Sequence, residues 1–455
     1  MANFRKKRIG WICVLLMALF ATSIQINAQA EPLRATDFSV TNTNDSGPGS
    51  LHQAILDANW ECGRERIQFN IPTTDPGYDP VLGVWFIDLT TNLPTLSDNA
   101  GVVIDGNSQL GTHADLPGII IRGTASLPSG SSLFTIASSS MDNKIVHLGI
   151  FNSQGISIFI IGDQNEIEDT QIFTSQMHGI YLTSDSHHNF IHDNHICGQL
   201  WDGIHLEGSG ANWINNNKIG LQPNYYPSVP ATSGNGISLI GSSLNSIANN
   251  NISYNKGHGI YLNASPDNII EDNVIGLSED LQEEFGNGKY GILVQESSNS
   301  QIYDNWISGN HMDGIRLVGG LTTGSKIEQN KIGMKMIGPA PNHHHGIGIY
   351  DHAHHNDIGR ELDPEYANFI VFNGWSGVVV VNSPSGGNNF IGTNMILHNK
   401  FYGVHINESP YNRIVANMIF DNGSAGTSAG VRIENMDPIL SDLSNYNLIK
   451  DNSIT

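Results

Sequence analysis

Two groups of residues with acid–base side chains recur along the chain at related spacings. The first contains His178, Tyr181, Asp202 and His205, and the second contains Tyr290, Asp313, Arg316 and His345. β-Elimination or epimerisation at a uronic acid needs a base, an acid and a cation that neutralises the carboxylate. Tyr, His and Arg supply these functions, so each group is a candidate catalytic site of a polysaccharide lyase, an epimerase or a glycoside hydrolase.

A repeated Gly-Ile or Gly-Val step fixes the spacing of both groups. Neighbouring copies stand 23 to 33 residues apart, and their glycines are Gly155, Gly179, Gly203, Gly236, Gly259, Gly291, Gly314, Gly346, Gly377, Gly403 and Gly430. In the pattern G-I-x-L the two aliphatic residues share one face of a strand, while x points to the other face. The period is that of one solenoid coil, so the candidate residues of adjacent copies should be neighbours in space.

A second pattern, N-x-I-x-x-N-x-I, lies between these glycines, for example at residues 189–196 and 412–419. Stacking coils ~4.8 Å apart places like residues over like and buries the aliphatic positions in columns. We therefore predict an all-β fold, a single-stranded right-handed parallel β-helix.

The two Asn positions of this pattern should form ladders of stacked amides, because an amide both donates and accepts hydrogen bonds. One column contains Asn143, Asn165, Asn189, Asn212, Asn245, Asn268, Asn356, Asn389, Asn412 and Asn447. The other contains Asn194, Asn217, Asn250, Asn273, Asn305, Asn330, Asn394, Asn417 and Asn452. A structural function is favoured for them over ligand binding.

Function on such a solenoid is expected on an outward column. The outward x is Ser157, Tyr181, His205, Ser238, Tyr261, Leu293, Arg316, Val379, His405 and Arg432. The residue before the glycine adds His178, Asp202, His258, Tyr290, Asp313, His345 and Tyr402. Rings stack on sugars, while His, Asp and Arg bond hydroxyls or a uronate, so this stripe predicts a glycan-binding face. Its expected substrate contacts are Tyr181, His205, Tyr261, Arg316, His405 and Arg432. The structural alternative is that exposed strand positions favour aromatic and polar residues anyway.

The beginning of the chain departs from the repeat. Ser50 and Gln53 have capping-box spacing, and Leu51, Ala54, Ile55 and Ala58 share one helical face. This pattern predicts a short helix that caps the open end of the core. We assign residues 36–140 to the cap and first irregular coils, and residues 141–455 to regular coils of the same domain.

Residues 1–30 have the features of a secretory signal peptide. A basic segment at 5–8 precedes an apolar run at 11–20, and Ala28-Gln29-Ala30 fits a cleavage site. The protein is expected to be secreted or held at the cell surface, with no membrane insertion after signal removal; a retained anchor is the alternative. Removal takes Lys and Arg from 21 to 17 against 43 Asp and Glu, a net charge of −26. Such a surface excludes nucleic acid and anionic lipid as partners.

The sequence motifs predict no metal site. The His-rich segments 342–346 and 351–357 do not force convergence, because consecutive strand residues point apart. Ca²⁺ remains an option at the acidic loop 278–284, which lacks a regular D-x-D-x-D-G pattern. After signal removal Cys62 and Cys197 remain, and we expect two separate thiols rather than a disulfide scaffold.

The segment VTNTNDSGPGSLHQAILDAN at 40–59 resembles the N-terminal segment of bacterial secreted right-handed parallel β-helix repeat proteins. The long coils at 217–239 and 273–294 are similar to the repeats of the same group, whose β-helices are of the carbohydrate-binding and sugar-hydrolase type with a pectate-lyase-like fold. The resemblance implies the fold, but the group includes lyases, epimerases, hydrolases and adhesins. The leading hypothesis is a protein that binds extracellular polysaccharide or cell-surface glycan. The alternatives are a polysaccharide lyase or uronate epimerase, and a non-catalytic adhesin stalk. Because residues 447–455 end on a complete Asn/Ile pattern, either the chain continues or a partner covers this end.

Overall fold

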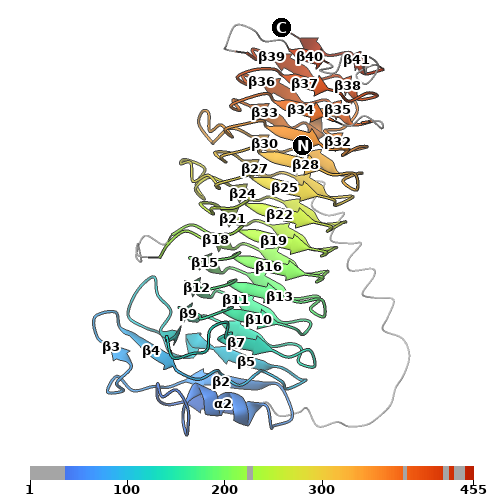
Figure 1. Ribbon diagram of the computed structural model, residues 1–455. Helices are drawn as coiled ribbons and strands as arrows, with labels where there is room; N and C mark the ends of the chain where they lie inside the picture. Colours follow the sequence, from blue (N-terminus) through green and yellow to red (C-terminus); the bar gives the residue numbers. More distant parts are fainter. Residues whose placement is uncertain (1–35, 223–228, 383–386, 424–429, 435–445, 455) are drawn as a thin grey trace, which may run out of the picture. The chain divides into compact units, whose positions relative to one another are not determined.

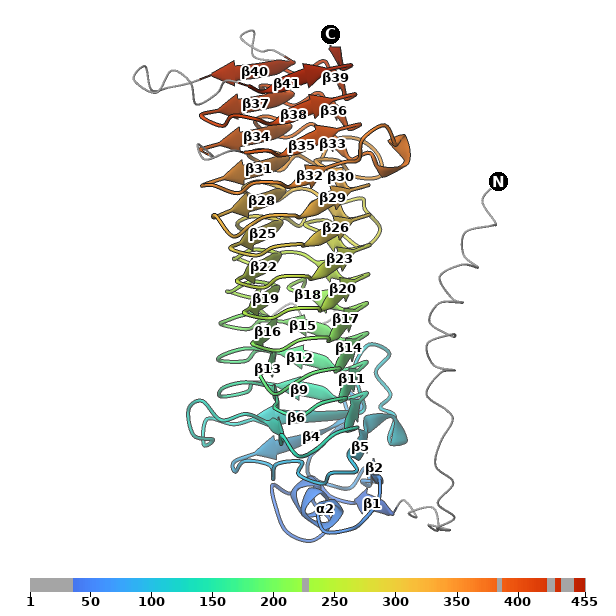
Figure 2. The ribbon, with the colours of Figure 1, turned by 90° about the vertical axis from the view of Figure 1, so that its right-hand side faces the viewer.

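The computed structural model describes residues 36–222, 229–382, 387–423, 430–434 and 446–454. The predicted signal peptide, residues 1–30, lies outside the described residues. Within them, successive strands fall into three sheets whose neighbours are parallel, apart from the antiparallel pair β3–β4 (Figures 1 and 2). The predicted coiled parallel architecture is confirmed.

One 15-stranded sheet runs from β1 (Asp37–Val40) to β41 (Leu448–Lys450), and a second runs from β3 (Tyr78–Asp79) and β4 (Val84–Leu89) to β42 (Ser453–Ile454). The third sheet has 12 strands in the described residues and carries the candidate site. Its strands are β7 (Phe134–Ile136), β10 (Ile158–Ile160), β13 (Ile180–Leu182), β16 (Ile204–Glu207), β19 (Ile237–Ile240), β22 (Ile260–Asn263), β25 (Ile292–Gln295), β28 (Ile315–Val318), β31 (Ile347–Tyr350), β34 (Val378–Val381), β37 (Val404–Asn407) and β40 (Val431–Glu434). We call it the twelve-stranded sheet.

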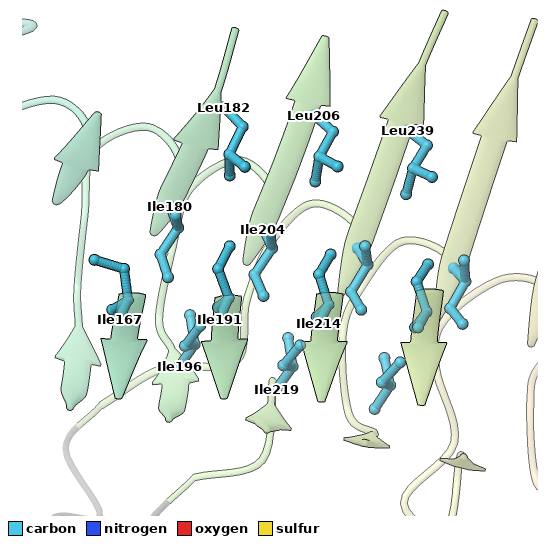
Figure 3. Close-up of a cluster of buried hydrophobic side chains, with 14 of the residues drawn as sticks. Ile167, Ile180, Leu182, Ile191, Ile196, Ile204, Leu206, Ile214, Ile219 and Leu239 are labelled. Carbon is cyan, nitrogen blue, oxygen red and sulfur yellow. The ribbon is translucent and has the colours of Figure 1, made fainter. Parts of the chain in front are cut away.

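The core consists of stacked aliphatic columns. Ile180 pairs in register with Ile204, and Leu182 with Leu206, and all four side chains are fully buried (Figure 3). Each short strand offers only one or two apolar side chains to the interior. Burial is therefore obtained between coils rather than within one coil.

The glycine of the Gly-Ile step is required by a close approach between coils. A Cβ on Gly203 would lie 2.7 Å from the carbonyl oxygen of Gly236 and 2.7 Å from Cγ2 of Ile219. Neither contact is compatible with van der Waals packing. The repeated glycine is therefore a packing requirement of the twelve-stranded sheet.

Both predicted Asn ladders are present. Asn194 Nδ2 donates to Asn217 Oδ1 at 3.0 Å and to the carbonyl oxygen of Ile167 at 2.8 Å, and this geometry repeats along the column. The positive φ falls on the residue before the ladder Asn, such as Asp193 at 59°, rather than on the Asn itself. Asn368 is a further member of this column, between Asn330 and Asn394.

A third ladder was not predicted. It consists of Asn255, Asn287, Asn310, Asn342, Asn373, Asn399 and Asn422. From Asn255 to Asn399, each member stands four residues before the glycine of a Gly-Ile or Gly-Val step, so a sequence signal existed.

The predicted capping helix is α2 (Leu51–Ala58). Ser50 is its N-cap, and its Oγ accepts the backbone N–H of Gln53 at 3.1 Å. The helix buries Leu51, Ala54, Ile55 and Ala58, the four residues of the predicted face. It packs beside β1 and β2 (Glu65–Phe69) at the first coil (Figure 2).

The register predicted for the first copy of the Gly-Ile step, at Gly155, is wrong by two residues. Ile158 pairs with Ile180, so Ser157 occupies the place of Gly179 and is buried, while Phe159 takes the outward position beside Tyr181. The sequence GISIFI at 155–160 contains two overlapping aliphatic pairs, Ile156 with Ile158 and Ile158 with Ile160. The prediction used the first pair, because it directly follows Gly155. The structure uses the later pair, because it aligns with the interior columns.

Candidate functional site

The outer face of the twelve-stranded sheet carries one continuous column of the predicted stripe. Strand register places Tyr181, His205, Ser238, Tyr261, Leu293 and Arg316 next to one another in that order. The column continues through Gly348, Val379, His405 and Arg432. All six expected substrate contacts therefore lie in this outer column.

The residues before the glycines form a second column, the pre-glycine column, which is largely buried. His178, His258 and His345 accept, through Nδ1, the backbone N–H of the next coil at 3.2–3.3 Å. Oδ1 of Asp202 and of Asp313 does the same at 2.8 and 3.0 Å. These His and Asp residues thus have a structural function that the sequence did not reveal, and only their remaining polar atoms are left for a ligand.

The first candidate group is brought together as expected. Nδ1 of His205 lies 2.9 Å from Oδ2 of Asp202, and the ring of His178 lies tilted against His205 with centroids 4.3 Å apart. Tyr181 lies edge-on to His205 at 5.1 Å, and its hydroxyl donates to the carboxylate of Glu207. Glu207 was not among the predicted residues; it stands four positions after Gly203.

The electrostatics of this group assign different functions to its members. Burial lowers the pKa of His178 to about 4, so this imidazole is neutral at pH 7. Burial opposes ionisation of Asp202, but hydrogen bonds from His205 and Asn235 outweigh it and hold the pKa of this carboxyl below its usual value. Burial and the Glu207 carboxylate raise the pKa of Tyr181 to about 12, which makes Tyr181 a proton donor rather than a base.

The second candidate group is also assembled. Arg316 lies 3.4 Å from Oδ2 of Asp313, and its guanidinium sits 5.1 Å from the ring centroid of Tyr290. The guanidinium is closer to Tyr350, at 3.7 Å from the ring centroid. Tyr350 was not predicted, and it stands four residues after Gly346, the same offset at which Glu207 follows Gly203. His345 joins the group through its backbone N–H to Asp313.

Burial dominates the electrostatics of the second group. It raises the pKa of Asp313 to about 6, although the N–H of His345 and the charge of Arg316 act in the opposite direction. Burial, with nearby His344, His405 and Arg316, lowers the pKa of His345 to about 3. Arg316 is therefore enclosed between a buried acid and two tyrosine rings, with its charge partly neutralised.

The two groups are too far apart to act on one sugar. Three positions of the outer column separate His205 from Arg316, which corresponds to four strand spacings or roughly 19 Å. The Asp–His pair lies at one end of this distance and the arginine at the other. The Asp202–His205 pair is thus not combined with Arg316 at one point of the stripe.

An aromatic hollow lies farther along the same face. It has a volume of about 450 Å³, and its walls include Tyr350, Trp375, Phe401 and Tyr402 over a floor formed by Val379. Trp375 and Phe401 were not predicted, although both stand two residues before the glycine of a coil. We call this feature the aromatic hollow.

Two described clusters bring three ligand-type atoms within 4.8 Å of one another: His178, Asp202 and His205, and Glu166, Glu168 and His192. In the second, Lys144 already forms ion pairs with both glutamates. In the first, His178 Nδ1 accepts a backbone N–H and His205 Nδ1 bonds Asp202. These atoms are thus engaged within the protein.

The His-rich segments do not converge on a shared point. His343 stacks on His311, with ring centroids 4.9 Å apart, while His344 stacks on Trp375 at 4.8 Å. In the acidic loop, Oδ1 of Asp280 accepts from Ser278 and from the N–H of Gln282. The two cysteines among the described residues are free thiols, with Cys62 exposed and Cys197 buried, as expected.

Residues 132–275 and 202–332 match the family described as "Right handed beta helix region". The three parallel sheets continue the same coil through the other described residues. The chain is a right-handed parallel β-helix.

Three solved structures are similar to this β-helix. The A-module of the mannuronan C-5 epimerase AlgE6 from Azotobacter vinelandii is 13% identical, with a TM-score of 0.48 and coverage of 88% of this chain and 100% of that chain. The Dettilon tailspike protein is 13% identical, with a TM-score of 0.44 and coverage of 90% and 70%. A mutant DFA-IIIase from Arthrobacter chlorophenolicus A6 is 13% identical, with a TM-score of 0.43 and coverage of 89% and 100%.

A search of curated proteins gives no match to the sequence. Among the described residues, none of the helices has the length and apolar character needed to cross a bilayer.

Proposed function

We propose that this β-helix is exported and binds extracellular glycan along the outer face of its twelve-stranded sheet. The observation that carries the proposal is the outer column, in which Tyr181, His205, Tyr261, Arg316, His405 and Arg432 share one face of the sheet. Export is supported by the basic and apolar segments within residues 1–30.

The spacing of the face suits an extended polymer. Rings at Tyr181 and Tyr261 offer flat apolar surfaces, while His205 and Arg316 offer polar atoms between and beyond them. Because one coil follows another every ~4.8 Å, successive side chains repeat along a line. A linear polysaccharide can contact several coils at once, which adds weak individual contacts into one affinity.

The side chains of the stripe are also held in place before any ligand arrives. Tyr181 is hydrogen-bonded to Glu207 and His205 to Asp202. Tyr261 is hydrogen-bonded to Gln295 at 3.1 Å. Fixed side chains lose little conformational entropy on binding. The stripe therefore has the preorganisation expected of a binding surface.

A second candidate function is proton abstraction from a sugar by the first group, as in a lyase or epimerase. The hydrogen bond between Asp202 and His205 favours it, because it leaves Nε2 of His205 as a hydrogen-bond acceptor. The separation from Arg316 weighs against a uronate substrate for this reaction, so binding remains the leading function.

The test is a glycan array with purified protein, followed by absorbance assays for unsaturated uronate. Tyr181→Ala combined with His205→Ala should weaken glycan binding at least tenfold. Trp213→Ala is a matched control, because Trp213 is an exposed ring on β17 (Trp213–Asn215), outside the twelve-stranded sheet. Unchanged binding in the double variant would refute the stripe, whereas release of unsaturated product would favour the lyase. Binding to no glycan would favour the adhesin stalk.

A further inference from the structure

The aromatic hollow differs from the rest of the stripe in what it can contact. Its volume of about 450 Å³ lies within the range of small-ligand sites, and the rings of Tyr350, Trp375, Phe401 and Tyr402 form much of its wall. The floor is provided by Val379 and its strand neighbour Val381. Few polar side chains lie in its lining; they are Ser376, His345, His405 and Glu434.

The rings of the hollow are positioned rather than loose. Trp375 is 48% exposed, yet its ring stacks on His344 at 4.8 Å and meets His345 edge-on at 5.2 Å. Phe401 lies edge-on to Trp375, with centroids 6.4 Å apart. An exposed tryptophan fixed by three neighbouring rings is a surface prepared for an apolar contact.

The carboxylate of Glu434 beside the hollow already has two partners within the protein. Oε1 of Glu434 lies 2.7 Å from Nε2 of His405, and Oε2 lies 2.7 Å from Nε of Arg432. The described lining contains neither lysine nor arginine. A ligand carboxylate would therefore meet a glutamate and apolar rings, with no unpaired cation to receive it.

The apolar wall also discriminates among neutral sugars. A hydroxyl enclosed against rings and valines without a partner loses its hydrogen bonds to water, whereas burial of a methyl group is favourable. At C6 an ordinary hexose carries a hydroxyl, where a 6-deoxyhexose carries a methyl group. A methyl group on a sugar can contact this apolar wall without needing a hydrogen-bond partner.

We propose that the aromatic hollow binds an uncharged sugar unit through a methyl-bearing group, either the C6 methyl of a 6-deoxyhexose or the methyl of an O-acetyl substituent. This inference rests on the proposed glycan-binding function and adds the class of sugar. The polymer lies along the outer column, and the methyl group enters between Trp375 and Phe401.

Two matched pairs of probes test the proposal. Acetylated xylan is compared with the same xylan after mild base treatment, and L-fucose is compared with L-galactose. Titration calorimetry serves for the polymers and saturation-transfer NMR for the monosaccharides. In at least one pair the methyl-bearing member should bind about tenfold more tightly. The pair that shows the preference identifies the source of the methyl group.

Trp375→Ala and Phe401→Ala should each remove most of this preference. Trp213→Ala should preserve it, since Trp213 is a comparably exposed ring that stacks on Phe190 at 4.5 Å on another sheet. Circular dichroism and the melting temperature show that each variant is folded. A preference that survives Trp375→Ala would overturn the proposal.

The outcomes separate this inference from the function on which it rests. Equal affinity within both probe pairs, with glycan binding that still depends on Tyr181 and His205, overturns the methyl site alone. Tighter binding of polyuronate than of any neutral glycan overturns the assignment of an uncharged sugar. Absence of binding to every glycan overturns both proposals.

Discussion

Asp202 holds His205 by a 2.9 Å hydrogen bond between Oδ2 and Nδ1, while its other oxygen accepts the backbone N–H of Asn235 at 2.8 Å. The carboxyl is ionised at neutral pH, because these hydrogen bonds hold its pKa low against the effect of burial. An ionised carboxylate only accepts, so Nδ1 of His205 carries the proton and Nε2 presents a lone pair. One buried acid thereby fixes both the coil-to-coil contact and the tautomer of a surface histidine.

Asp202→Asn should reverse that tautomer. The Asn oxygen can still accept from Asn235, but its Nδ2 now donates toward His205, which moves the imidazole proton to Nε2. ¹⁵N NMR of the ring nitrogens checks this exchange. Sugar hydroxyls both donate and accept, so glycan binding should change by less than about threefold, whereas base catalysis at Nε2 would be lost. Retention of the Nδ1–H tautomer would contradict the assignment.

His258→Asn should flatten the pH dependence of stability. Burial first, then the charge of Lys289, lowers the pKa of His258 to about 4. The unfolded histidine takes up a proton near pH 6.5 and the folded one only near 4, so this contribution to stability is complete above pH 6.5 and is lost as pH falls toward 4. Between pH 7 and pH 5 the loss is about 1–2 kcal/mol.

The replacement is designed to retain the structural hydrogen bond at that position. Asn235 occupies the preceding place of the same column, and its Oδ1 accepts the N–H of His258 at 2.8 Å. Denaturant unfolding of wild type and variant at both pH values measures the difference, and His188→Asn at an exposed position is the control. Any loss of ring stacking on Tyr290 affects both pH values equally. An unchanged pH dependence would disprove the burial argument.

Asn273→Ala should destabilise the fold by about 2–4 kcal/mol. Asn273 Nδ2 donates to Asn305 Oδ1 at 3.0 Å and to the carbonyl of Ile247 at 2.8 Å, so truncation leaves buried groups without partners. Asn215→Ala is the control, because Asn215 lies exposed on β17. Thermal unfolding should separate the two variants clearly. Equal melting temperatures would show that the ladder adds no stability.

Gly314→Ala should be much less stable than Gly320→Ala. A Cβ on Gly314 would lie 2.8 Å from the carbonyl oxygen of Gly346 and 2.8 Å from Cγ2 of Ile332, whereas at Gly320 the nearest atom is 3.9 Å away. Overpacking of this kind costs about 1–3 kcal/mol. Melting temperatures of the two variants give the comparison. A tolerated Gly314→Ala would mean that the coils can separate at this point.

The repeated patterns were sufficient to predict the coils, because aliphatic spacing of two and a constant period leave few other folds. They failed where two registers were compatible with the same letters. Around Ser157, the two overlapping aliphatic pairs of GISIFI differ only in which Ile joins the buried column of the core. The Asn255 ladder is not predicted for another reason: its amides stand four residues before the step glycine, outside the Asn/Ile pattern.

The candidate site, like the fold, was predictable from the sequence only in part. The constant coil period determined, from sequence alone, that Tyr181 would neighbour His205 and that Asp313 would lie beside Arg316. Only the tertiary structure decided how deeply these groups are buried. Asp313 is 1% exposed, and one of its carboxylate oxygens accepts a backbone N–H from the next coil. Likewise, the sequence spacing does not reveal that Trp375, Phe401 and Tyr350 enclose a hollow. Spacing specifies which coil a residue belongs to, whereas burial and pKa depend on how the side chains of adjacent coils cover one another.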